Sequence, residues 1–80
     1  MEDIMRKKII EEIRRQNVVK DYLWRFQQYN PFRFSLNPVE QREFDKVMSD
    51  LCDEGIFTVE KNGSVMTYRL TEKGERIIYS

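Results

Sequence analysis

Histidine is absent from this chain of 80 residues, and cysteine occurs once, as Cys52. Without histidine, the chain lacks the side chain that most often transfers protons in enzymes near neutral pH. A metal site would lack its usual nitrogen ligand, and a single cysteine cannot form a disulfide within the chain. Glycine-rich phosphate loops and nucleophile elbows are missing as well. We therefore expect no enzymatic activity, no bound metal and no cofactor.

Cys52 itself is predicted to be structural. Asp53 and Glu54 follow it directly, and their negative charges would raise the pKa of its thiol. A thiol that stays protonated is a poor nucleophile. We interpret Cys52 as a small residue beside a packed helix face.

Long apolar segments are also missing. Runs of apolar residues are short throughout, so no segment is expected to span a membrane. The first residues are rich in charge and precede no apolar signal region, which favours a cytoplasmic protein. With 40% apolar residues the chain has enough material for one small core, and we expect a single domain over residues 1–80.

The net charge is zero, but the charges are distributed unevenly. Residues 1–37 hold eight basic and five acidic residues, a balance of +3. Residues 38–60 hold two basic and seven acidic residues, a balance of −5, and residues 61–80 hold four basic and two acidic, a balance of +2. The middle of the chain is therefore a poor match for an anionic partner.

Two segments have the apolar spacing of an amphipathic helix. In residues 3–16 the spaced apolar stripe is Met5, Ile9 and Ile13, with Ile10 beside it. In residues 37–54 the expected buried stripe is Phe44, Val47, Met48 and Leu51. We expect both stripes to face one common core.

The helix over 37–54 also has clear end signals. Asn37 is expected to cap it, with Pro38 at the first helical position and Glu40 completing a capping box. Gly55 is expected to end the helix by taking the left-handed backbone conformation.

Residues 56–60 and 65–70 are predicted to form two antiparallel strands joined by a turn at Asn62-Gly63. This turn would place Val59 opposite Met66. One face of the hairpin would then carry Phe57, Val59, Met66, Tyr68 and Leu70. A slip by one residue would scatter this set, so the turn and the apolar pattern agree on the register.

Residues 18–36 allow two interpretations. As a helix over 18–29, the apolar residues would form one stripe, and Phe32–Leu36 would be a loop or a short strand. As a β-hairpin, aromatic and polar residues would alternate on both sides of "QQYNP". The helix is the favoured prediction, and the hairpin stays open as the alternative.

Two short motifs stand on either side of the predicted hairpin. Leu51, Glu54, Gly55 and Ile56 form "L-x-x-E-G-I", and residues 68–74 form "Y-x-L-T-E-K-G". With the order of predicted elements, they make residues 47–78 resemble the winged helix-turn-helix superfamily, in particular PadR-like and MarR-like small bacterial proteins. The resemblance implies an α+β winged helix with a three-helix core, a two-stranded antiparallel wing and a short C-terminal helix.

Gly74 stands inside this last helix, which Thr71 is expected to cap. Glycine destabilises a helix by about 1 kcal/mol relative to alanine. If the last helix docks on the first, backbone must pass close to backbone, and a side chain at position 74 would not fit.

In DNA-binding members of the superfamily, the helix before the wing lies in the major groove and the wing touches the backbone or the minor groove. The resemblance therefore implies double-stranded DNA as a partner and a role in transcription regulation. The candidate contact residues are Asn37, Gln41, Arg42 and Lys46 on the helix and Lys61, Asn62 and Arg69 on the wing. Phosphate contacts supply most of the affinity, so the acidic residues 38–60 predict weak, non-specific binding.

A protein-interaction module is the alternative function. Six of the ten aromatic residues lie within residues 22–34. On a helix over 18–29, Trp24 would point away from the apolar stripe, toward solvent or a partner. Trp24, Arg25 and Tyr29 are therefore candidate interface residues for a homodimer or another protein.

Overall fold

The computed structural model describes residues 2–80, which form four helices and three strands. The elements are α1 (Glu2–Arg15), β1 (Leu23–Trp24), α2 (Phe26–Phe34), α3 (Pro38–Asp53), β2 (Phe57–Asn62), β3 (Val65–Leu70) and α4 (Glu72–Tyr79). The strands form an antiparallel sheet in the order β1-β3-β2. Within residues 2–80, no helix has both the length and the apolar character that crossing a bilayer requires.

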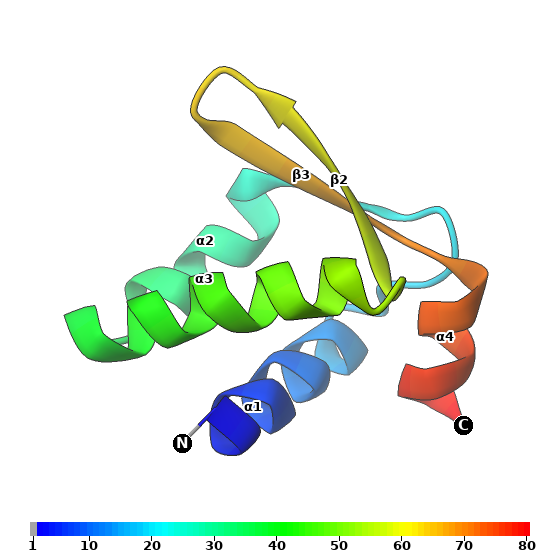
Figure 1. Cartoon of the computed structure of the whole chain (residues 1–80), viewed down its shortest axis with the longest axis horizontal. Coiled ribbons are helices and arrows are strands. Elements are labelled where there is room, and N and C mark those ends of the chain that lie inside the picture. The colour runs from blue at the N-terminus through cyan, green and yellow to red at the C-terminus, as the bar shows by residue number, and fades with distance from the viewer. Residues whose placement is uncertain (1) are drawn as a thin grey trace.

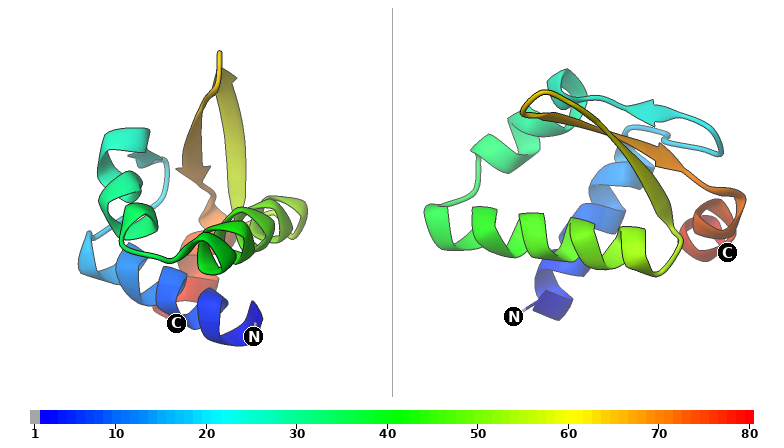
Figure 2. Two further views of the ribbon diagram at one scale, coloured as in Figure 1. Left: turned by 90° about the vertical axis from the view of Figure 1, so that its left-hand side faces the viewer. Right: turned by 45° about the horizontal axis from the view of Figure 1, so that its top comes forward.

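The β2–β3 hairpin rises from the C-terminal end of α3 and leans back over that helix (Figure 1). Helix α1 lies on the other side of α3, and α4 lies away from the tip of the hairpin. In the left view of Figure 2 the tip rises above the helices, and in the right view it lies over the start of α2. This α+β layout is compatible with the expected winged arrangement, but strand β1 adds a third strand to the predicted two.

Helices α1 and α3 form as predicted and bury their apolar stripes. The stripe residues of both helices are at most 2% exposed, apart from half-buried Ile10: Met5, Ile9, Ile13, Phe44, Val47, Met48 and Leu51. Asn37 Oδ1 accepts a hydrogen bond from the Glu40 N–H at 2.9 Å, and Glu40 Oε1 accepts one from the Asn37 N–H at 3.2 Å. Gly55 follows with a φ of 81°. The predicted cap and the predicted left-handed end are both confirmed.

Both interpretations of residues 18–36 are wrong. A turn follows α1, and in it Asn17 and Asp21 adopt φ values of 55° and 65°. A short strand then precedes helix α2, which begins at Phe26 and includes Phe32 and Phe34. The segment therefore contains a strand and a helix in succession.

Pairing with a distant strand explains this outcome. The Asp21 N–H donates to the Leu70 carbonyl at 2.9 Å, and the Leu70 N–H donates to the Tyr22 carbonyl at 3.3 Å. Strand β1 then continues along β3, with Trp24 opposite Tyr68. These long-range bonds satisfy backbone groups that a local helix would otherwise have used.

The hairpin forms, but the predicted register is wrong by two residues. Val59 pairs with Tyr68 and not with Met66, and Phe57 pairs with Leu70. Because side chains alternate between faces with a period of two, a shift of two residues leaves every side chain on its predicted face.

The turn explains the shift. Its two central residues are Gly63 and Ser64, flanked by the pair Asn62 and Val65, instead of the predicted Asn62-Gly63. Gly63 has a φ of 63°, whereas Ser64 has a negative φ. A glycine at the first central position is what a type II′ hairpin turn requires, so the glycine sets the turn from the first position and not from the second.

Gly74 lies where α4 meets the corner between α3 and β2. A Cβ at position 74 would overlap the Ile56 carbonyl oxygen and would lie 2.8 Å from Leu70 Cδ1. Thr71 closes the same junction, because its Oγ1 donates to the Gly55 carbonyl at 2.6 Å and accepts from the Gly74 N–H at 3.0 Å. The expected close backbone contact is present, but it is made with this corner and not with the first helix.

Trp24 is part of the core. It is 0% exposed, and its indole N–H donates to Gln16 Oε1 at 3.0 Å. Its ring lies 6.1 Å from the Phe57 ring, in a stacked arrangement, and 5.5 Å from the Tyr29 ring. The prediction that Trp24 is an exposed interface residue is wrong, because β1 joins the sheet and turns this side chain inward.

Replacing Trp24 with alanine should therefore destabilise the fold. Removing a buried aromatic side chain costs about 3–5 kcal/mol, a large share of the roughly 4–12 kcal/mol typical for a domain of this size. Urea unfolding measures the effect, with Ile4→Ala at a surface position as the control. A loss below about 1 kcal/mol for Trp24→Ala would contradict this burial.

Gly74→Ala should also destabilise the chain, although alanine is the better helix former by about 1 kcal/mol. The added methyl group must push α4 away from Ile56, and we expect a net loss of about 2 kcal/mol. Urea unfolding again gives the value, and Arg76→Ala on the exposed side of α4 should change little. Equal stability of Gly74→Ala and the wild type would show that α4 does not pack at this corner.

Candidate functional site

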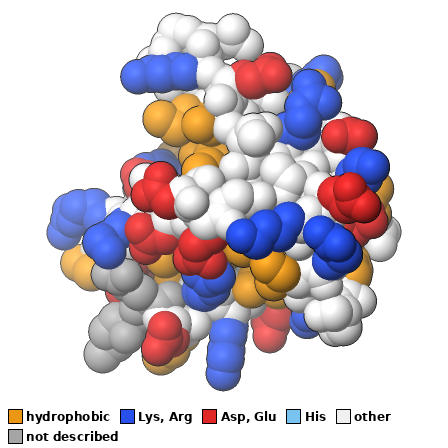
Figure 3. All heavy atoms as spheres, turned by 45° about the vertical axis from the view of Figure 1, so that its right-hand side comes forward, with side chains coloured by type: hydrophobic (Ala, Val, Ile, Leu, Met, Phe, Trp, Pro, Cys, Tyr) orange, Lys and Arg blue, Asp and Glu red, His pale blue; other side chains and the backbone are white. Residues whose placement is uncertain are grey.

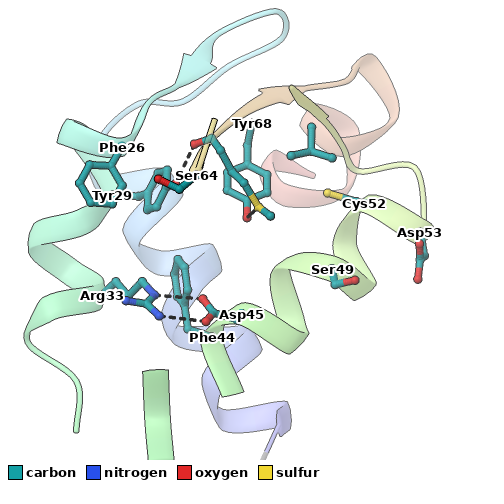
Figure 4. Close-up of a pocket in the computed structure, with 12 residues that line it drawn as sticks. Phe26, Tyr29, Arg33, Phe44, Asp45, Ser49, Cys52, Asp53, Ser64 and Tyr68 are labelled. Carbon is teal, nitrogen blue, oxygen red and sulfur yellow. Dashed lines mark hydrogen bonds and ion pairs between the residues drawn. The ribbon is translucent and has the colours of Figure 1, made fainter. Parts of the chain in front are cut away.

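A groove of about 540 Å³ lies between α2, α3 and the hairpin. Its positions on α2 (26, 29, 33) recur every three or four residues, so they lie on one helix face. On α3 the lining positions are 44, 45, 49, 52 and 53. Its apolar lining consists of Phe26, Tyr29, Phe44, Val59, Met66 and Tyr68. We call this hollow the α3–hairpin groove (Figure 4).

Aromatic rings form the floor of the groove. The Tyr29 ring lies 6.1 Å from the Phe44 ring and 5.5 Å from the Tyr68 ring. The Tyr29 hydroxyl donates to the Met66 carbonyl at 2.7 Å. The Tyr68 hydroxyl donates to Met66 Sδ at 3.4 Å, a weak acceptor. Burial raises the pKa of Tyr68, so this hydroxyl stays protonated.

An ion pair closes one end of the groove. Arg33 Nε and Nη2 donate to Asp45 Oδ1 and Oδ2 at 3.0 and 2.9 Å, and the two side chains meet from α2 and α3 (Figure 4). This hydrogen bonding raises the pKa of Arg33. The pair ties the two helices together, and its guanidinium charge is taken up by Asp45.

Ser49, Cys52, Asp53 and Ser64 complete the polar lining. Burial, followed by the charge of Asp53, raises the pKa of the Cys52 thiol. The direction agrees with the prediction from the sequence, and the thiol is held in its unreactive form. Counting Arg33 against Asp45 and Asp53, the charged lining of the groove has a balance of −1.

Three cationic side chains outside the groove lining are exposed and have no side-chain partner within residues 2–80. Arg42 lies on α3 and Lys61 near the tip of β2. Arg25 directly follows β1, beside β3, and its backbone N–H donates to Gln28 Oε1 at the start of α2. Arg25 was predicted as a partner residue, and it is the one member of that set at the surface.

Two other predicted DNA-contact residues on α3 are used by the fold. Asn37 serves as the cap of α3, and Gln41 Nε2 donates to the Leu36 carbonyl at 3.0 Å. Lys46 Nζ lies 3.8 Å from Asp50 Oδ2. These contacts leave Arg42 as the main predicted α3 residue available for a partner.

On the hairpin, Arg69 Nη2 lies 3.5 Å from Glu60 Oε1. Asn62 is exposed at the end of β2, next to the turn. Tyr29, predicted as a partner residue, is buried beneath the hairpin at 5% exposure. The structure therefore separates the predicted residues into a few exposed contacts around the groove and a larger set that holds the fold together.

Sequence reasoning missed most of the groove. Its apolar rim consists of Phe26, Val59 and Met66, none of which was a predicted site residue. The alternation in the hairpin did place Val59 and Met66 on one face. That signal could not show that the face overhangs a hollow, because α2 was placed at the wrong residues.

Within residues 2–80, no cluster of acidic or thiol side chains is arranged to hold a metal ion. Comparison with known proteins gives no match, whether with family models, with curated proteins or with solved structures.

Proposed function

We propose that the chain is a small winged-helix module that binds duplex DNA through α3 and the hairpin, in the service of transcription regulation. The observation that carries the proposal is the presence of three exposed cations without a side-chain partner within residues 2–80: Arg42 on α3, Lys61 on β2 and Arg25 at the start of α2. The order of α2, α3 and an antiparallel hairpin supports it, since this order is typical of a helix for the major groove followed by a wing.

The start of α2 adds a second favourable feature. Arg25 stands at the N-terminal end of this helix of nine residues, where the helix dipole is positive. Backbone N–H groups at such an end favour a phosphate group. An exposed arginine at the same place strengthens that preference.

The remaining charges predict that binding is weak. Helix α3 holds five acidic and two basic residues, a balance of −3. Ion pairs occupy Arg33 and Arg69. On the face drawn in Figure 3, basic and acidic side chains are interleaved and no large patch of one sign forms. Few phosphate contacts are therefore available, and the affinity should depend on them.

The test is a titration of duplex DNA at several salt concentrations. Three phosphate contacts predict a slope of about −2.7 for the logarithm of the association constant against that of the salt concentration, a fall of about 40-fold between 50 and 200 mM. Replacing Arg42 and Lys61 together with alanine should reduce the slope to about −0.9. The loss should be similar for DNA of different sequence.

Arg76→Ala is the matched control, because it removes one exposed cation from α4 and should leave the slope unchanged. An unchanged slope in the double variant would contradict the proposed face. Tight binding with a shallow slope would also contradict the proposal, since it would require base readout with few phosphate contacts.

A homodimer through the corner between α2 and α3 is the second candidate, and it carries forward the predicted protein interaction. Phe34 at the end of α2 is 74% exposed, and Val39 at the start of α3 is 59% exposed. Large apolar side chains at the surface of one corner are typical of a contact with another protein. The homodimer would thus form around Phe34 and not around Trp24.

Sedimentation at rising protein concentration tests the homodimer. The wild type should associate, and Phe34→Ser should remain monomeric with unchanged stability, because the side chain is at the surface. A wild type that stays monomeric at millimolar concentration would rule out this second candidate.

A further inference from the structure

The α3–hairpin groove has the size and lining of a small-molecule site. Its volume of about 540 Å³ lies within the range of about 300–1,000 Å³ that is typical of such sites. Three large apolar side chains at its edge remain 38–45% exposed: Phe26, Val59 and Met66. Their positions come from α2 and from both strands of the hairpin, so they surround the aromatic floor. A flat apolar molecule would cover all of these surfaces at once.

The charges of the lining determine whether a cation or an anion would bind more favourably in the groove. Asp53 is exposed and has no side-chain partner within residues 2–80. Asp45 neutralises the guanidinium of Arg33, so the net charge left in the groove is negative. An anion would meet the carboxylates, which disfavours it.

We propose that the α3–hairpin groove binds a planar aromatic cation of about three fused rings, placed between the hairpin and α3. The rings would lie against the exposed side chains of Phe26, Val59 and Met66, and the positive charge would face Asp53. The same charges make the groove unsuitable for a phosphate backbone, so this ligand is distinct from DNA. The proposal does not depend on DNA binding, and it can be tested without DNA present.

The test uses two dyes with a matched ring system and opposite charge, 9-aminoacridinium and anthracene-2-sulfonate. Fluorescence titration should show saturable binding of the cation, at least about tenfold tighter than that of the anion, a difference of about 1.4 kcal/mol. Trp24, the one tryptophan of the chain, offers a second readout. Its ring lies 5.5 Å from the Tyr29 ring in the groove floor, so the bound cation should quench its emission.

Two substitutions on one strand locate the site. Val59 lines the groove, whereas Thr58, its neighbour, points to the opposite face of the hairpin. Val59→Lys should weaken binding of the cation about tenfold or more, because it places a positive charge and extra bulk in the groove. Thr58→Lys adds the same charge outside the groove and should change the affinity less than about twofold.

Asp53→Asn supplies an independent check at an exposed position that the fold does not use. This substitution should weaken binding of the cation several-fold and leave the thermal unfolding temperature of the protein unchanged. Equal or tighter binding of the anion, equal effects of Val59→Lys and Thr58→Lys, or no saturable binding of the cation would each overturn the proposal.

Discussion

The close approach of α4 to the corner between α3 and β2 sets the direction of the hairpin, and the groove depends on that direction. Gly74 allows the contact, because a side chain there would overlap the Ile56 carbonyl. Thr71 holds it through hydrogen bonds to the backbone at Gly55 and Ile56. Strand β3 runs directly into this junction, so the contact fixes the end of the hairpin that lies next to α3.

The aromatic residues connect the core to the surface. Trp24 and Phe57 are fully buried, whereas Tyr29 and Tyr68 belong to the core and also form the floor of the groove. The floor is thereby held rigid by packing from below. Around it, carboxylates line the hollow while unpaired cations stand outside it, so a DNA backbone and a small aromatic cation would use different parts of one face.

Local signals in the sequence were enough for the elements whose geometry is local. The cap at Asn37, the stripe of α3 and the left-handed Gly55 each depend on neighbouring residues, and each is confirmed. The prediction for residues 18–36 was wrong because β1 is held by hydrogen bonds to β3, a strand more than forty residues away in the sequence. The predicted hairpin register was wrong because Gly63 was placed at the second central position of the turn and not at the first. The groove was not predicted, because α2 forms one of its walls and was placed at the wrong residues.

The central claim is that partners bind on the face formed by α3 and the hairpin. An NMR titration of the ¹⁵N-labelled chain with duplex DNA at low salt tests it most directly. Binding at this face should give saturable shifts concentrated in residues 25–28, 40–53 and 57–68, with the amides of α1 and α4 unaffected. Shifts concentrated on α1 and α4, or none at all, would contradict it.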